Sequence, residues 1–263
     1  MIHNAGIVAT SVGFACLVPA FEANAQFATF TGGASQELAW QAAAGGNVPL
    51  EDFESYHGGL CCAPTDQVTA LPALGIVFAT DVPGAYPGVY NYQPQAHSGQ
   101  NQLANFGGGL SAYADYRILP ESGKAIYALG FWQCDPQGDQ TMYAFDALGT
   151  LVGQITGHIN DGGGLSFAGF VSTIPIARVV VEGLLGDGWN HIDDLQVVAR
   201  SSCPADFDGD GTPDFFDYDA FVICFEGGPC PPGPPPRTAD FDADGTVDFF
   251  DYDAFVVAFE AGC

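Results

Sequence analysis

The sequence predicts a mainly β protein in which an antiparallel β-sandwich is followed by a small all-α domain. Between residues 26 and 200, short segments rich in Val, Ile, Phe and Tyr are separated by Gly, Pro, Asn and Asp, without regular alternation of strands and helices. After residue 201 an acidic segment followed by an apolar helical segment occurs twice. We therefore divide the chain into a β-sandwich domain at 26–200 and a C-terminal domain at 201–263.

The first 25 residues have the character of a secretory signal peptide. Residues 6–21 are small and apolar, and an Ala-Asn-Ala cleavage sequence ends at Ala25. The apolar stretch is too short, and too interrupted by proline and glutamate, for a membrane anchor. We expect a secreted protein, extracellular or associated with the cell surface, in a compartment that permits disulfides.

One helix and nine strands are expected in the sandwich domain. The helix covers 35–44, with Ser35 as its N-cap and Gly45 and Gly46 as its stop. The expected strands are 51–55, 74–80, 111–118, 125–133, 141–146, 151–157, 165–171, 177–182 and 191–198. Strands separated by turn signals over about 170 residues fit a single sandwich core.

The C-terminal repeats, 205–226 and 239–260, are identical at 18 of 22 positions and are joined by a Pro-rich linker at 227–238. In each repeat, carboxylates occupy loop positions 1, 3, 5, 9 and 12, glycine occupies position 6, and a threonine carbonyl at position 7 adds a ligand. Ca²⁺ takes about six to eight oxygen ligands, so this spacing predicts one Ca²⁺ in each loop. The predicted ligands are Asp206, Asp208, Asp210, Thr212, Asp214 and Asp217, then Asp240, Asp242, Asp244, Thr246, Asp248 and Asp251.

A short amphipathic helix follows each loop, but none precedes it. Apolar residues stand at helical spacing from Tyr218 and again from Tyr252, whereas the prolines before the second loop exclude an entering helix. This doubled, EF-hand-like half motif at 203–263 resembles the type I dockerin domain, through which secreted proteins dock onto cohesin domains. The resemblance implies a cohesin-like or cell-envelope protein as partner.

Loop positions 10 and 11 depart from the cellulosomal dockerins, which carry small or hydroxylated recognition residues there. Here these positions are Phe215, Phe216, Phe249 and Phe250, which argues against an ordinary cellulosomal cohesin. The phenylalanines either fill the small core between the helices or form the docking surface. The final Gly-Cys resembles the GC-type dockerins of planctomycete-like secreted proteins, which implies an anchoring or sorting signal; a plain disulfide staple is the alternative.

Seven cysteines follow the signal peptide. In the C-terminal domain, a bridge between Cys224 and Cys230 would close a small loop. One between Cys203 and Cys263 would close the whole domain and stabilise it by about 2–4 kcal/mol. Such bridges are expected because a domain of this size has a small core. The sequence does not decide how the other three cysteines, Cys61, Cys62 and Cys134, are paired.

The net charge of −26 argues against a nucleic-acid partner, because such a surface repels phosphate backbones. Half of that charge lies at 203–263, where 12 Asp and 2 Glu face Arg237 alone. Because the loop carboxylates repel one another, we expect folding of this domain to be coupled to Ca²⁺ binding.

The sandwich sequences LEDFES, HSGQNQLANF and GDGWNHIDDLQVV resemble the jelly-roll, lectin-like domains of secreted bacterial proteins. The resemblance implies that an acidic group of the first strand and one of the last strand meet around a structural Ca²⁺. Here these are Glu54 or Asp52 with Asp193 or Asp194, and carboxylates that only accept hydrogen bonds are the alternative. The aromatic residues most suited to stack on a carbohydrate are Tyr86, Tyr90, Tyr92 and Trp189, although packing against the sandwich edge would also explain them.

Catalytic motifs are missing from the sequence: it has no HExxH, no GxSxG and no ExDxxE glutamate pair. We therefore expect a secreted, non-catalytic interaction or surface protein, whose dockerin-like calcium module anchors a lectin-like sandwich. The alternative is a dockerin-borne, polysaccharide-active enzyme of the glycoside hydrolase type, or a carbohydrate-binding protein.

Overall fold

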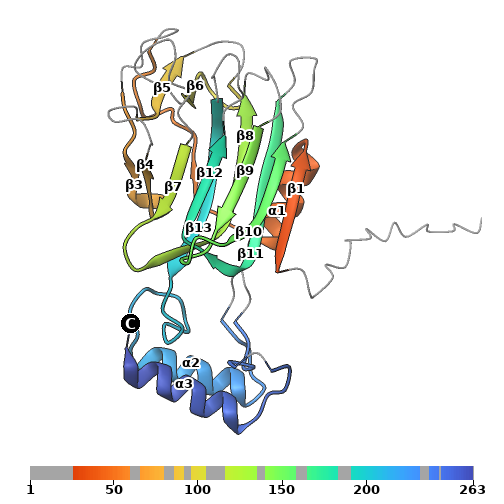
Figure 1. The fold of residues 1–263 in the computed structure, drawn as a ribbon, viewed down its shortest axis with the longest axis vertical. Coiled ribbons are helices and arrows are strands. Elements are labelled where there is room, and N and C mark those ends of the chain that lie inside the picture. Colours follow the sequence, from red (N-terminus) through yellow and green to blue (C-terminus); the bar gives the residue numbers. More distant parts are fainter. Residues whose placement is uncertain are drawn as a thin grey trace, which may run out of the picture.

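The computed structural model describes residues 26–59, 66–79, 86–91, 96–104, 116–134, 140–157, 165–182, 191–231, 237–242 and 244–262. Two antiparallel sheets pack face to face, and two helices form a small separate layer at one end (Figure 1). The predicted β-sandwich followed by a small helical domain is confirmed. Among the helices of the described residues, none has the length and apolar character needed to cross a membrane.

The first sheet has the strand order β1, β11, β8, β13, β6, β5, and β2 pairs with β13 as well. Its strands are β1 (Phe27–Gly32), β2 (Leu50–Glu51), β5 (Gly88–Asn91), β6 (Asn101–Ala104), β8 (Lys124–Cys134), β11 (Ser166–Ile176) and β13 (His191–Ser201). The second sheet has the order β10, β9, β12, β7, β4, β3. Its strands are β3 (Ala70–Leu71), β4 (Ile76–Ala79), β7 (Tyr116–Pro120), β9 (Gln140–Phe145), β10 (Leu151–Gly157) and β12 (Arg178–Glu182), and a 3-10 turn at Pro72–Leu74 joins β3 to β4.

This strand order is that of a jelly roll. From β6 to β13 the chain crosses to the opposite sheet at every connection except the β9–β10 hairpin. The last two strands are inserted into the middle of the sheets, with β12 between β7 and β9 and β13 between β6 and β8. Such an alternation between two antiparallel sheets is typical of jelly-roll domains.

Residues that point inward from both sheets form the core, which includes the fully buried Phe131, Phe170 and Val179. A bulge in β13 lies between Asp193 and Gln196, where Asp194 has a φ of 48°. Because of this bulge, Ile192 and Leu195 both face the core although they are three residues apart. The bulge therefore sets the orientation of the two carboxylates between them.

Helix α1 (Ala34–Ala43) covers the outer face of the first sheet (Figure 1). Its Trp40 is fully buried in a cluster with Trp132 and Phe167, and the indole N–H donates to the carbonyl of Phe170 at 2.9 Å. The predicted stop is confirmed, since Gly45 and Gly46 both have a φ of 98°. The predicted N-cap is wrong: Gly33 precedes the helix and no side chain caps it.

Most predicted strands are present, and the differences have local causes. The strands expected at 125–133, 141–146, 151–157 and 177–182 correspond to β8, β9, β10 and β12. The strand expected at 51–55 ends at Glu51, because Phe53 has a φ of 58° and turns the chain so that its ring is fully buried. Strands β1, β3, β5 and β6 were not predicted.

The C-terminal domain consists of helices α2 (Phe215–Phe225) and α3 (Phe249–Ala261), which lie side by side (Figure 1). Phe221 and Phe255 are fully buried and stack with ring centroids 4.2 Å apart. Phe207 packs edge-on against both rings. The domain follows β13 directly, where the backbone N–H of Ser202 donates to the carbonyl of Gly123 at 3.0 Å.

Candidate metal centres and docking surface

Both acidic loops bring carboxylates together within the span of one metal ion. In the first loop, oxygen atoms of Asp206, Asp208 and Asp210 all lie within 4.8 Å of one another. In the second loop, the same holds for Asp240, Asp242 and Asp251. The turns require glycine, since Gly211 and Gly245 at position 6 have φ values of 100° and 92°.

The first carboxylate of each loop has one oxygen that is hydrogen-bonded and one that is not. Oδ2 of Asp206 accepts from the N–H of Gly211 at 3.1 Å, and Oδ2 of Asp240 accepts from Gly245 at 3.0 Å. The Oδ1 atoms of both aspartates are buried and have no hydrogen-bond donor. A buried anionic oxygen without a donor is destabilising unless a cation neutralises it. These oxygens and their acidic neighbours fit a hard cation such as Ca²⁺.

The carboxylates at loop position 12 are fully buried and tie each loop to the start of its helix. The two oxygens of Asp217 accept from the N–H groups of Asp208 at 2.8 Å and Asp214 at 2.7 Å. Those of Asp251 accept from Phe241, Asp242 and Asp248 at 2.6, 3.1 and 2.8 Å.

The two position-12 carboxyl groups titrate differently. Burial raises the pKa of Asp217 despite its backbone hydrogen bonds. Burial also acts to raise the pKa of Asp251, but its backbone hydrogen bonds outweigh that effect and hold the pKa below its ordinary value.

Positions 7 and 9 have local structural roles that the sequence left unassigned. Asp214 and Asp248 are the N-caps of α2 and α3, and each forms a capping box with the position-12 aspartate. The N–H groups of Thr212 and Thr246 donate to the carboxylates two residues earlier at 2.8 Å, which tightens each turn. Asp244 accepts the second of these bonds and is outside the second metal-sized group of carboxylates. Metal ligation by these five residues, as by the other seven predicted ligands, stays a prediction.

The four phenylalanines at loop positions 10 and 11 are exposed. The exposed fractions are 71 % for Phe215, 68 % for Phe216, 69 % for Phe249 and 68 % for Phe250. The possibility that they fill the core between the helices is therefore wrong, because Phe207, Phe221 and Phe255 form that core. The two pairs have nearly equal exposed fractions, so the repeats hold them in equivalent settings. We define these four side chains as the aromatic surface.

The cysteines of the domain agree with the predicted framework as far as the described residues reach. Cys224 and Cys230 form a disulfide. Cys203 is also disulfide-bonded, and Cys263, its expected partner, lies outside the described residues. In the sandwich, Cys134 is buried, whereas Cys61 and Cys62 lie outside the described residues.

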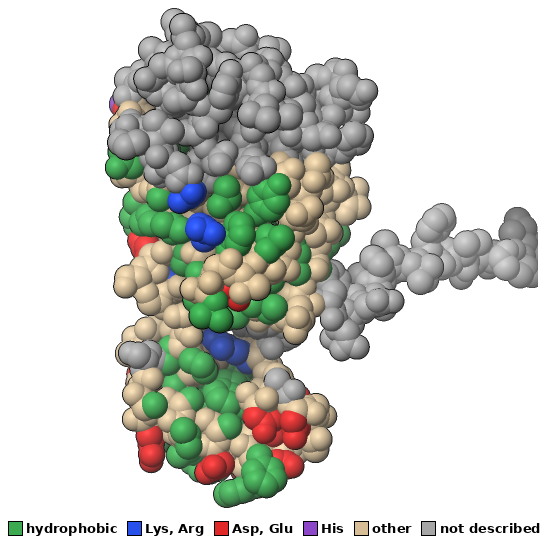
Figure 2. Space-filling view, in the orientation of Figure 1, with side chains coloured by type: hydrophobic (Ala, Val, Ile, Leu, Met, Phe, Trp, Pro, Cys, Tyr) green, Lys and Arg blue, Asp and Glu red, His purple; other side chains and the backbone are tan. Residues whose placement is uncertain are grey.

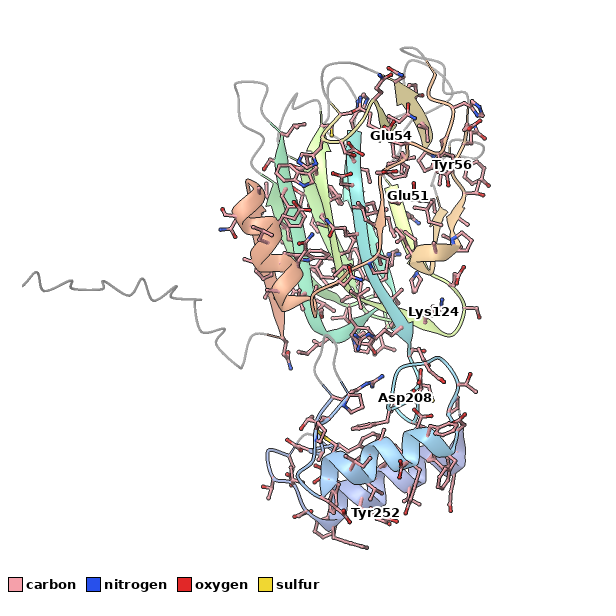
Figure 3. All side chains as sticks on the ribbon, turned by 180° about the vertical axis from the view of Figure 1, so that it is seen from behind. Glu51, Glu54, Tyr56, Lys124, Asp208 and Tyr252 are labelled. Atoms are coloured by element: carbon pink, nitrogen blue, oxygen red, sulfur yellow. A yellow bond between two sulfur atoms is a disulfide. The ribbon has the colours of Figure 1, made fainter. Side chains whose placement is uncertain are left out.

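Two of the sandwich carboxylates that were expected to share a Ca²⁺, Glu54 and Asp193, accept hydrogen bonds from the backbone of the same segment, 98–101. Glu54, at the end of the sandwich away from the C-terminal domain (Figure 3), accepts from the N–H groups of Gln100 and Asn101 at 2.7 and 2.6 Å. Asp193 accepts from the N–H of Ser98 at 2.9 Å. Asp52 instead accepts from the N–H of Glu54 at 3.1 Å. Ca²⁺ binding by Glu54, Asp193 and Asp194 stays a prediction.

Sequence reasoning missed the partners of Asp194. Its carboxylate contacts Nδ1 of His97 at 2.5 Å and accepts from the hydroxyl of Ser98 at 2.6 Å. The ring of His97 stacks on Trp132 with centroids 3.8 Å apart. The adjacent Asp193 is fully buried, and this burial raises its pKa to about 7. His97 and Ser98 lie far from β13 in the sequence, and only the fold brings them beside Asp193 and Asp194 near the beginning of that strand.

The proposed carbohydrate-stacking residues do not form one exposed group among the described residues. Tyr90 is only 1 % exposed and lies parallel to the ring of His191, with centroids 6.2 Å apart, so its assignment as a stacking surface is wrong. Tyr86 is 36 % exposed. Tyr92 and Trp189 lie outside the described residues.

Comparison with known proteins identifies no relative by sequence: no family model and no curated protein matches the chain. Two solved structures illustrate the similarity that is found. A cleaved adhesin domain of Lys-gingipain from Porphyromonas gingivalis shares 14 % identity over 57 % of this chain and 98 % of that chain, with a TM-score of 0.36. A family 29 carbohydrate-binding module shares 13 % identity over 46 % of this chain and 90 % of that chain, with a TM-score of 0.28.

Proposed function

We propose that residues 203–262 form a calcium-dependent docking module that attaches the β-sandwich to a partner protein. The observation that carries this proposal is the pair of buried, donor-less oxygens, Asp206 Oδ1 and Asp240 Oδ1, at equivalent places in the two loops. Each has further carboxylates within reach of one ion. Ca²⁺ would neutralise these groups and complete the turn that leads into each helix.

The aromatic surface supports docking as the role of the module. Four phenylalanines that remain about two-thirds exposed are costly on an isolated domain, and exposed apolar groups of this size mark interaction sites. They occupy positions 10 and 11 of the calcium loops, which are also the first two residues of α2 and of α3. Metal binding would therefore position the surface that a cohesin-like or cell-envelope protein contacts. Because the two halves match, the partner can bind in either of two orientations.

The sandwich is then the part that the module carries. We expect it to be secreted and to act by binding rather than by catalysis.

Calorimetry of the full chain tests the metal sites. Asp206→Asn and Asp240→Asn should each remove one bound Ca²⁺ relative to the wild type, and helix content should rise on Ca²⁺ addition in circular dichroism. Exposed Asp219→Asn, which removes the same charge from α2, is the matched control and should keep both sites. Full Ca²⁺ stoichiometry in both loop variants would refute the proposal.

Replacement of the four phenylalanines by serine tests docking separately. Their exposure predicts an unchanged Ca²⁺ stoichiometry and helix content, together with loss of Ca²⁺-dependent capture from the native envelope fraction. The control is Val257→Ser, which removes a 60 % exposed apolar side chain from α3 outside the aromatic surface. Equal capture by the serine variant and the wild type would contradict a docking role for these residues.

A further inference from the structure

The outer face of the second sheet carries a hollow that the calcium module does not explain. On β7, β12 and β9, the paired residues Ile118, Val179 and Ala144 are buried in the core. Their neighbours in sequence therefore point outward. Strand pairing places Arg117, Val180 and Tyr143 in one outward row, and Arg178 and Phe145 in the next.

These five outward side chains line a shallow hollow with a cavity volume of about 280 Å³. All five are half-buried. Two of the five are arginines, and Figure 2 shows basic side chains surrounded by hydrophobic ones on this face of the sandwich. The hollow therefore combines two guanidinium groups with aromatic and aliphatic walls.

The gathering of two arginines is unusual in this chain, which has only five basic residues against 31 acidic ones. Arg178 lies over the ring of Phe145, with Cζ 4.4 Å from the ring centroid. Its Nε is buried without a hydrogen-bond acceptor, and no carboxylate of the described residues forms an ion pair with it. The Nε–H of Arg178 can therefore still donate a hydrogen bond to a bound anion.

We propose that this hollow binds a sugar acid through its carboxylate group. Guanidinium groups present planar, fixed pairs of N–H donors that match the two oxygens of a carboxylate. The ring of a uronate holds its carboxylate rigidly, so little conformational freedom is lost on binding. That ring can pack on Tyr143 and Val180 while its ring oxygen and hydroxyl groups accept from the remaining N–H groups.

An acidic peptide presents the same carboxylate on a flexible side chain and loses more conformational freedom on binding. A second copy of this chain would bring another 26 negative charges against a protein of the same sign. Both are therefore less favoured occupants than a uronate unit, and both are tested below.

The test is titration of the full chain, at fixed Ca²⁺, with glucuronate, followed by nuclear magnetic resonance. We expect glucuronate to shift the resonances of Tyr143 and Val180, and glucose, the matched neutral sugar, to leave them in place. Arg178→Gln should weaken glucuronate binding about tenfold or more, as expected for loss of a charge-assisted hydrogen bond. Lys124→Gln, which removes the same charge from a residue ion-paired with Glu121, should bind like the wild type.

A second variant covers the case in which Arg178→Gln is poorly folded. Val180→Glu places a carboxylate inside the hollow and should abolish glucuronate binding while the melting temperature is kept. Equal binding of glucose, or unchanged affinity in both hollow variants, would overturn the proposal. Equal binding of N-acetylglutamate amide would overturn the sugar assignment in favour of an acidic peptide, and concentration-dependent dimers lost in Val180→Glu would favour a second copy. The hollow contains none of the loop aspartates, so a negative result for sugar-acid binding would not affect the proposal that the C-terminal domain binds Ca²⁺.

Discussion

The replacement Asp217→Asn should weaken Ca²⁺ binding at the first loop by about 10- to 100-fold. Asp217 is fully buried, and each of its oxygens accepts one backbone N–H, from Asp208 at 2.8 Å and from Asp214 at 2.7 Å. Asparagine has the same shape but only one oxygen, so one of the two N–H groups faces an NH₂ group. Loss of one hydrogen bond to a charged group costs about 1.5–3 kcal/mol. Since about 1.4 kcal/mol is tenfold in affinity, this gives the stated range.

Calorimetry with Ca²⁺ on the full chain measures this effect. The second site should keep its affinity, because Asp251 makes the corresponding bonds in its own loop. Asp219→Asn is the control, since Asp219 is exposed two residues further along α2 and the change in net charge is the same. If Asp217→Asn and Asp219→Asn give the same isotherm, the effect is one of overall charge and the reasoning from the buried hydrogen bonds is refuted.

Three further predictions concern the sandwich. Burial raises the pKa of Asp193 from 3.8 to about 7, so in chelator the wild type should lose about 4 kcal/mol of unfolding free energy as the pH rises from about 4 to above 7. Urea unfolding should show no such loss in Asp193→Asn, and an identical pH profile would contradict a neutral carboxyl group. Trp40→Phe removes a buried hydrogen bond and should lower the unfolding free energy by about 1–3 kcal/mol, whereas Leu38→Ala, at a 66 % exposed position, should change it by less than about 0.5 kcal/mol. A Ca²⁺ site at Glu54 predicts that Glu54→Ala lowers the melting temperature more in Ca²⁺ than in chelator, and an equal decrease would leave only its hydrogen bonds to Gln100 and Asn101.

The sequence was most informative where a pattern depends on neighbours along the chain. Spacing alone identified both acidic loops and both helices, because the turn glycines and the apolar residues of each helix stand at fixed intervals along the chain. The strand predicted at 177–182 is likewise present as β12, which lies between β9 and β7. These patterns depend only on residues close together in the sequence, and the structure contains the loops, helices and strand that they predict.

Features set by distant contacts could not be predicted in this way. The turn at Phe53 depends on burial of its ring in the core, and Tyr90 is buried because it stands beside His191 of β13. The donor-less oxygen of Asp206 likewise becomes visible only once the loop is closed and packed. The hollow at Arg117 and Arg178 depends on the register of β7, β12 and β9, which no spacing within one strand reveals.

The position of β13 has a mechanical consequence. The strand leads directly into the C-terminal domain, so tension applied through that domain enters the sandwich at Ser201. β13 is a central strand, paired with β8 from His191 to Ser201 and with β6 and β2 on its other side. A pull along the strand loads these hydrogen bonds together in shear, instead of opening them one at a time as at an edge strand. The sandwich therefore receives force at one of its most extensively paired strands, which suits a domain held by its C-terminal end.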